Sequence, residues 1–167
     1  MRSQSGFSVT ELLVAVVVAG ILATVAIPAF SGPGIDCDDP NARPGPLMRA
    51  RIADVTGDLG EIHIALARFE LANNRYPSNL AEMGLEGRVD PWGNPYQYLI
   101  VLGREDIGPV RKDNNLQPVN TNYDLYSMGP NGRTESPLNS NLGQDDIVLA
   151  NDGGYLGPAC RYTGSGM

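Results

Sequence analysis

Side chains of the types that carry out catalysis are sparse in this chain of 167 residues. It has one histidine, His63, and two cysteines, Cys37 and Cys160. No serine stands in a nucleophile elbow, no glycine-rich loop has the spacing that cradles phosphate, and His63 is expected at the surface rather than in a metal site. The cysteines fit no zinc pattern, so in an exported chain they predict one disulfide. These residue types predict a protein that is not an enzyme.

Glu11 is the carboxylate with the most unusual surroundings, because it lies at the leading edge of the apolar run Gly6–Phe30. From residue 12 onward only a glycine, a threonine and a proline interrupt the aliphatic and aromatic side chains. A helix of this length crosses most of a bilayer core of about 30 Å. A carboxylate at mid-bilayer costs about 2.5–3.5 kcal/mol. The two alternatives, a cleaved signal peptide and a simple membrane anchor, do not explain why a carboxylate should be kept at this cost. In addition, no small-residue cleavage site follows the run.

The sequence around Glu11, G-F-S-V-T-E-L-L, resembles the leader junction of type IV pilins and of the pseudopilins of type II secretion. The resemblance implies that a prepilin peptidase cuts after Gly6 and methylates Phe7, the new N-terminus. A carboxylate in lipid requires a cation, and the α-amine of Phe7 in an adjacent subunit would supply one. We therefore expect residues 1–6 to be a leader and residues 7–30 to be a membrane anchor that becomes the filament core.

The charge of the chain bears on its partners and its orientation. Its formal net charge is -7 at pH 7, which disfavours nucleic acid as a partner. Arg2 is the only basic residue before Arg43. By the positive-inside tendency the N-terminus would lie in the cytoplasm and the remainder in the periplasm. We therefore predict a single-pass protein of the bacterial inner membrane that assembles into a periplasmic or extracellular filament.

Residues 31–46 form the clearest break in the chain, with four prolines and three glycines that cannot continue a helix. Pilin-like proteins usually run one long helix into the head, and this chain departs from that pattern. A flexible linker is one interpretation. We prefer a tethered loop, because Cys37 lies in the insert and its only possible partner within the chain, Cys160, lies near the C-terminus. Closing a loop of over a hundred residues stabilises a fold by about 4–5 kcal/mol in the chain-entropy model.

Residues 47–167 are expected to form the globular head. Apolar residues at steps of three and four predict a helix of about 28 residues that ends at Asn73–Asn74. The stripe comprises Met48, Ile52, Val55, Leu59, Ile62, Leu66 and Phe69. Strands are predicted at Tyr96–Leu102, Tyr123–Met128 and Asp146–Ala150. The predicted fold class is α+β, with this amphipathic helix packed on a small antiparallel sheet, and the stretch Gly103–Asn122 is either disordered or a surface contact.

Two further blocks resemble the major pseudopilins of type II secretion: N-N-R-Y-P at 73–77 and D-P-W-G-N-P-Y-Q-Y-L at 90–99. The resemblance implies a pilin-like fold and a structural subunit of a helical pseudopilus, which pushes folded substrates through an outer-membrane pore. The implied partners are further copies of the chain, the prepilin peptidase, an assembly ATPase, an inner-membrane platform protein and minor pseudopilins. Two alternatives are a subunit of a type IV pilus or other extracellular filament, and a membrane-anchored binding module.

The same resemblance implies a calcium site. In major pseudopilins a loop near the C-terminus closes around the ion through backbone oxygens and carboxylates, a mix of hard ligands that suits calcium. Carried over residue by residue, Met128 and Val148 would give carbonyl oxygens, and Asp145 and Asp146 carboxylates. Asn131 stands where the family usually has an aspartate, so we expect weaker binding or no ion. The alternative is an Asn-Gly turn beside two solvated acids.

Overall fold

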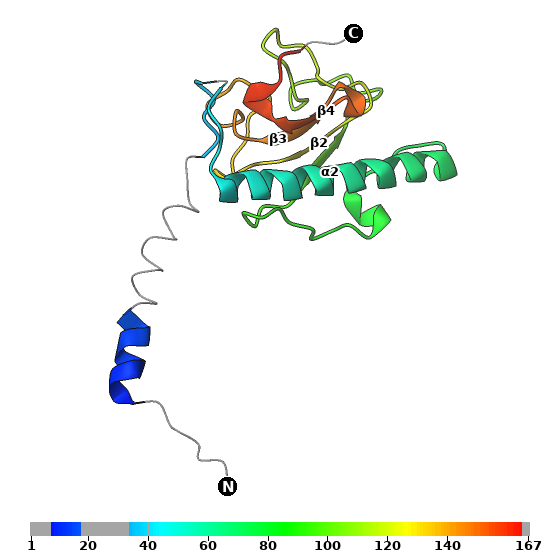
Figure 1. Cartoon of the computed structure of the whole chain (residues 1–167). Helices are drawn as coiled ribbons and strands as arrows, with labels where there is room; N and C mark the ends of the chain where they lie inside the picture. The colour runs from blue at the N-terminus through cyan, green and yellow to red at the C-terminus, as the bar shows by residue number, and fades with distance from the viewer. Residues whose placement is uncertain (1–7, 18–33, 40, 165–167) are drawn as a thin grey trace.

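The computed structural model of the chain describes residues 8–17, 34–39 and 41–164 (Figure 1). Residues 9–17 form a helix at the start of the predicted hydrophobic segment. The cleavage junction Gly6–Phe7, the remainder of that segment and the first part of the insert lie outside the described residues. Within the described ranges, no helix is both long enough and apolar enough to cross a membrane.

The long helix of the head, α2, spans Pro46–Asn73 and has the 28 residues that the periodicity predicts. It begins directly after the proline-rich insert, with a proline at its first position, where the missing N–H costs no hydrogen bond. It ends because Asn74 adopts a left-handed conformation, φ 53°, and donates its backbone N–H to the Glu70 carbonyl at 2.7 Å. The predicted helix is confirmed at both ends.

One face of α2 is completely buried against the sheet. The middle of the predicted stripe, from Val55 to Leu66, forms the contact, while its end residues Met48 and Phe69 are half-buried. The resulting core comprises Val55, Leu59, Ile62, Leu66, Tyr96, Tyr123, Leu125, Ile147 and Leu149. Each fully buried aliphatic side chain of this kind contributes about 1.5–3 kcal/mol.

The sheet has four antiparallel strands in sequence order. They are β1 (Gln97–Ile100), β2 (Tyr123–Ser127), β3 (Ile147–Ala150) and β4 (Tyr155–Pro158). The first three lie inside the predicted strands, so the α+β prediction is confirmed. The fourth was missed because Gly157 and Pro158 are disfavoured in strands. A short 3₁₀ helix, η2 (Asn151–Gly153), turns the chain from β3 into β4.

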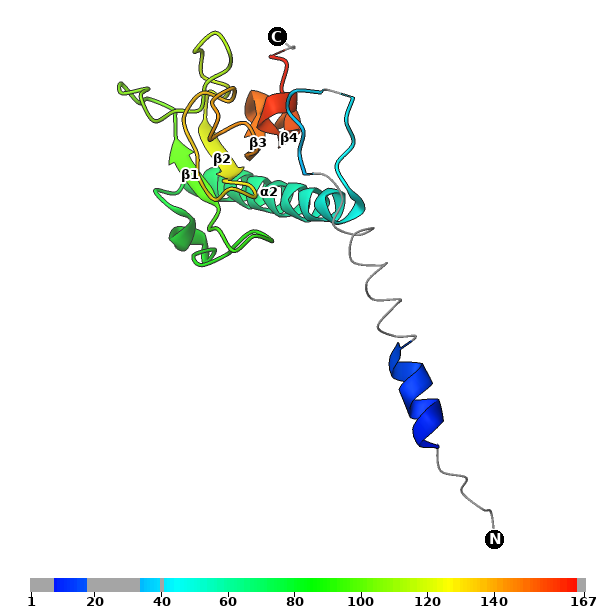
Figure 2. The ribbon, with the colours of Figure 1, turned by 90° about the vertical axis from the view of Figure 1, so that its left-hand side faces the viewer.

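Different parts of the chain pack on the two faces of the sheet. Successive strand residues point to opposite sides, so Leu125 and Leu149 face α2, whereas Val148 and Ala150 belong to a second buried cluster. Figures 1 and 2 show α2 on one side of the sheet and the loops with the C-terminal end of the head on the other. The second cluster comprises Val119, Leu138, Val148, Ala150 and Ala159. The stretch Gly103–Asn122 helps to cover this second face.

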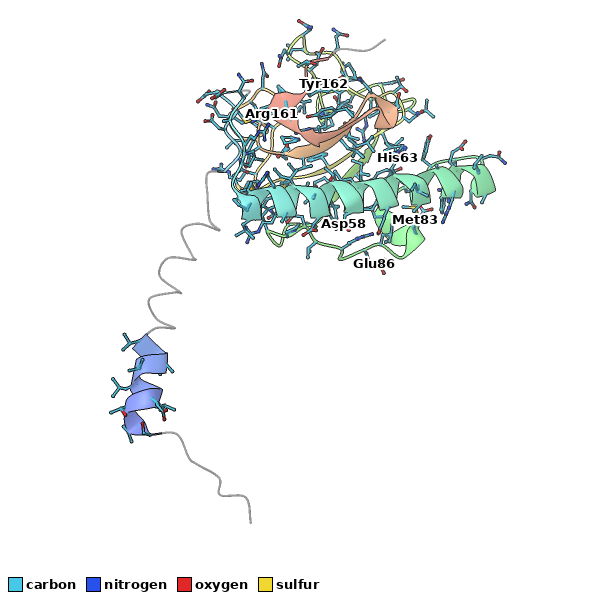
Figure 3. The ribbon with its side chains drawn as sticks, in the orientation of Figure 1. Asp58, His63, Met83, Glu86, Arg161 and Tyr162 are labelled. Carbon is cyan, nitrogen blue, oxygen red and sulfur yellow. A yellow bond between two sulfur atoms is a disulfide. The ribbon has the colours of Figure 1, made fainter. Side chains whose placement is uncertain are left out.

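The segment after α2 returns alongside the helix to start β1. It contains the 3₁₀ helix η1 (Leu80–Met83), and Figure 3 labels Met83 and Glu86 in this segment and Asp58 on α2. Arg88 forms ion pairs with the carboxylates of Asp58 and Glu61 on α2. The segment is therefore fastened to the helix before the chain enters the sheet.

The block at residues 90–99 forms a turn that leads into β1. Its buried Asp90 carboxylate accepts hydrogen bonds from the backbone N–H groups of Trp92 at 3.0 Å and Asn94 at 2.9 Å, and from the Ser127 hydroxyl at 2.5 Å. The indole of Trp92 packs against the core beneath α2. One carboxylate thus fixes both the turn and the end of β2.

His63 is not the surface residue that its isolation in the sequence suggests. It is half-buried, and its Nδ1 lies 2.6 Å from the hydroxyl of Tyr123 on β2 (Figure 3). This side chain connects α2 to the sheet and has no metal-binding neighbours among the described residues.

Candidate functional site

Glu11 caps its own helix at the N-terminus. The backbone N–H of Ser8 donates to Glu11 Oε2 at 3.0 Å, and the backbone N–H of Glu11 donates to Ser8 Oγ at 3.2 Å. This reciprocal arrangement of a serine and a glutamate three residues later is a capping box. The carboxylate is therefore held next to the first turn of the helix, where the partial positive charge of the helix dipole also favours it.

The helix that Glu11 begins presents apolar side chains all round. Every described residue from 8 to 17 is exposed in the single chain. The large apolar side chains among them are Val9, Leu12, Leu13, Val14, Val16 and Val17, each between 52% and 78% exposed. A helix with an apolar surface on all sides requires apolar neighbours, either lipid or other helices.

Cys37 and Cys160 form a disulfide with a Cα–Cα distance of 5.6 Å, as the sequence predicts. Next to it, Arg161 donates to the carbonyl oxygens of Asp36 at 3.2 Å and Ala42 at 2.7 Å. Figure 3 labels Arg161 on the side of the head where the insert lies. The insert is thus tied to the C-terminal end of the head by a covalent bond and two hydrogen bonds.

Asp146, a predicted calcium ligand, is completely buried beside a cation from another part of the chain. Its Oδ2 accepts from the Arg111 guanidinium in an ion pair whose two side chains are 3% and 0% exposed, and from the Thr134 hydroxyl at 2.6 Å. Burial raises the pKa of the Asp146 carboxyl, and the charge of Arg111 opposes that rise. Asp146 Oδ1 and Arg111 Nε have no hydrogen-bond partner in the described structure.

The guanidinium of Arg111 binds the loop that joins β2 to β3. It donates to Thr134 Oγ1 at 2.5 Å and to the Glu135 carbonyl, and it stacks 4.5 Å from the centre of the Tyr126 ring. The backbone N–H of Arg111 donates to the buried Asp124 carboxylate at 2.7 Å. Arg111 therefore links β2 to the loop: its backbone binds Asp124 on β2, and its side chain binds the loop.

Asn131 and Asp145, two further predicted ligands, bind each other. The Asn131 amide donates to Asp145 Oδ1 at 2.5 Å, and its backbone N–H donates to Asp145 Oδ2 at 3.1 Å. The Asn131 side-chain oxygen accepts from the backbone N–H of Arg133 at 2.6 Å. Both oxygens of Asp145 and the one side-chain oxygen of Asn131 already have donors.

The five predicted ligands therefore do not form one set of free oxygens. Val148 lies in the middle of β3, between Tyr126 and Gly157 of the flanking strands, where the sheet uses its backbone. No group of three or more His, Cys, Asp or Glu side chains within the described ranges is placed to hold a metal. Calcium binding stays a prediction, and these residues do not fit the ion as they are arranged.

Arg111 is the residue of this site that sequence reasoning missed. It lies in the stretch Gly103–Asn122, whose polar and irregular composition suggested disorder or a surface contact. Within that stretch Val110 and Arg111 are 0% and 2% exposed. The stretch contains two arginines and a lysine, and nothing local indicates which of them is buried or which carboxylate it meets.

Comparison with known proteins places the chain in a family. Residues 1–27 match the family described as the prokaryotic N-terminal methylation motif. The type II secretion system core protein G of Pseudomonas aeruginosa is 32% identical over 155 residues, which cover 79% of this chain and 87% of that protein. The same protein of Aeromonas hydrophila is 31% identical over 154 residues, covering 78% and 86%. No solved structure matches the chain.

The methylation motif together with the helix-and-sheet head defines a pilin-like filament subunit. Within that class, the identity and coverage of the relatives decide the family. The chain belongs to the type II secretion system core protein G family, the major pseudopilins.

Proposed function

We propose that the chain is extracted from the inner membrane and polymerises through its N-terminal helix into a pseudopilus that drives folded substrates across the outer membrane. Membership of the major pseudopilins supports the role of filament subunit. The observation that carries the mechanism is the position of Glu11, a carboxylate at the start of a helix whose other large side chains are exposed and apolar.

Assembly changes the surroundings of this carboxylate. In the single chain the capping bond from Ser8 satisfies one oxygen of Glu11, and water or lipid headgroups can reach the other. When apolar helices bundle, the carboxylate is withdrawn from water and needs a cation. Cleavage after Gly6 would create an α-amine on Phe7, four residues before Glu11, and a neighbouring subunit would present that amine to the carboxylate. The charge pair would thus set the axial register between subunits.

The remaining steps follow from this assembly chemistry. Before assembly, lipid covers the apolar helix and the head lies in the periplasm. Removal of the leader by the prepilin peptidase must come first, because only the cleaved chain has the amine. Extraction of an apolar helix from lipid requires work, which an assembly ATPase acting through a membrane platform protein would supply. Minor pseudopilins would start the filament, and the role of the chain is structural rather than enzymatic.

Substitution of Glu11 tests the proposal. We expect Glu11→Ala to leave the chain in the membrane at the normal level and to reduce filament yield at least tenfold, because the cation of the neighbour loses its partner. Glu11→Gln keeps an oxygen that can accept the Ser8 bond and removes only the charge. The measurement is the amount of subunit in sheared or cross-linked filaments relative to the membrane fraction.

Thr10→Ala is the matched control, because Thr10 is polar and adjacent to Glu11, and among the described residues its hydroxyl bonds only to the Ser8 hydroxyl. It should assemble normally. Equal assembly defects in the glutamine and alanine variants assign the effect to the charge. Normal filaments from Glu11→Gln would assign it to helix capping instead, and normal filaments from both variants would contradict the proposed pairing.

A further inference from the structure

We propose that Arg111 is a built-in cation that holds the loop between β2 and β3 closed, so that the head of this pseudopilin folds without calcium. The loop carries the residues that the family resemblance assigned to the ion, and one of them, Asp146, is paired with this arginine instead. The inference concerns the stability of the head and does not depend on how the filament is assembled.

Burial shows that this arginine is part of the core of the loop. The side chains of Arg111 and Asp146 are 3% and 0% exposed, so the pair is shielded from water and from screening by salt. The stacked ring of Tyr126 covers one face of the guanidinium. When two opposite charges are buried in this way, removing either one leaves the other unpaired and destabilises the fold.

The groups around the guanidinium are those that a hard cation takes. They are one carboxylate, one hydroxyl and one backbone carbonyl, from Asp146, Thr134 and Glu135. Calcium prefers the same oxygen donors. Here they accept N–H groups of a side chain that stays protonated under all ordinary conditions. A divalent ion at the same place would meet the positive charge of Arg111 at close range, which opposes its binding.

The hydrogen bonds of Asn131 also support the replacement of an ion by protein side chains. Its amide donates to one oxygen of Asp145, and its backbone N–H donates to the other. An aspartate at this position would lose the amide donor and place two carboxylates in contact, which is unfavourable without a metal between them. The loop therefore has one carboxylate fewer than the family pattern, and another of its carboxylates, Asp146, is paired with a buried arginine.

The backbone fixes Arg111 in this position. Next to it, Lys112 donates its N–H to the Ser136 carbonyl at 3.0 Å and accepts from the N–H of Leu138 at 2.9 Å. These bonds attach the segment that carries Arg111 directly to the loop that it closes. The guanidinium consequently does not have to be ordered by a ligand.

The decisive measurement uses the wild-type chain. Full-length protein in detergent micelles is stripped of metal, and thermal unfolding is followed by near-ultraviolet circular dichroism with millimolar calcium chloride or with chelator. We expect coincident midpoints, and no saturable heat when calcium chloride is titrated into the protein by calorimetry. A higher midpoint in calcium, or a saturable binding heat, would overturn the proposal.

Variants of the pair provide a second test. Arg111→Met keeps much of the volume but leaves Asp146 buried without its cation, which should lower the midpoint by about 10–20 °C. Arg104→Met is the control, because Arg104 is exposed on the same segment. The double variant Arg111→Met/Asp146→Asn removes both charges and should recover part of the loss. No recovery would mean that Arg111 acts through packing alone and would contradict its role as the cation.

Asn131→Asp distinguishes a loop that Arg111 holds closed from a metal site that lacks one ligand. We expect it to lower the midpoint in chelator and to gain nothing from calcium, because Asp146 is still paired with Arg111. If calcium instead raised the midpoint of this variant above that of the wild type, the loop would be a metal site that lacks one ligand. If Arg111→Met does not fold, this comparison and the wild-type titration still decide the question.

Discussion

At the scale of single residues, the proposed assembly depends on Gly6 and Phe7, which would decide whether Glu11 can find a partner. The methylation-motif match covers both residues and Glu11. Before cleavage, the amide nitrogen of Phe7 carries no charge. After cleavage it is an α-amine with an ordinary pKa of about 8, and therefore a cation at neutral pH. In the proposed pairing, cleavage of one peptide bond would thus decide whether the carboxylate can be withdrawn from water.

Mass spectrometry of assembled subunits tests this processing. We expect an N-terminal peptide that begins with methylated Phe7, and no peptide that contains Met1. Gly6→Val should block cleavage, leave the Met1 terminus in the membrane fraction and abolish filaments, because the neighbour has no free amine. Assembled subunits with an intact Met1 terminus would refute the role assigned to Phe7.

At the scale of elements, α2 is the part of the head whose packing is most one-sided. Leu59 is completely buried in the middle of the helix, whereas Leu71, twelve residues later on the same helix, is 79% exposed. The helix is therefore stabilised by its contact with the sheet and much less by its other faces.

Leu59→Ala and Leu71→Ala form a matched pair that tests this asymmetry. We expect Leu59→Ala to lower the free energy of unfolding by about 2–5 kcal/mol, because it leaves a cavity against the sheet. Leu71→Ala should change it by less than about 0.5 kcal/mol. Urea unfolding of the full-length chain in detergent, followed by the fluorescence of Trp92, measures both. Equal losses would show that α2 does not pack as described.

At the scale of the whole molecule, the disulfide Cys37–Cys160 joins segments that are 123 residues apart and so closes most of the head into one loop. The insert to which Cys37 belongs contains no regular secondary structure in its described part. Its attachment includes this bond, the hydrogen bonds of Arg161 to the Asp36 and Ala42 carbonyls, and the packing of Ile35 against the core.

The double variant Cys37→Ser/Cys160→Ser measures this attachment. In the chain-entropy model a loop of this length stabilises the fold by about 5 kcal/mol, so we expect a loss of that order. Limited proteolysis should cut the variant first within the insert and leave α2 intact. Unchanged stability, or two free thiols in a non-reducing peptide map of the exported wild-type protein, would contradict this prediction.

The sequence alone determined the features that depend on local patterns. The apolar run with Glu11 predicts a membrane-embedded assembly segment, because membrane preference acts over a run of neighbouring residues. The stripe in α2 and three of the strands are likewise periodic signals. Even the disulfide was predictable, because two cysteines allow only one pairing within a chain.

Tertiary structure decided what fills the loop between β2 and β3. Arg111 meets Asp146, 35 residues away, only because the stretch Gly103–Asn122 folds over the second face of the sheet. Nothing in the composition of that stretch indicates burial, since a buried charge is stable only through a partner that the local sequence does not contain. Likewise β4, with its glycine and proline, is a strand because β3 offers it an edge and not because its residues prefer one.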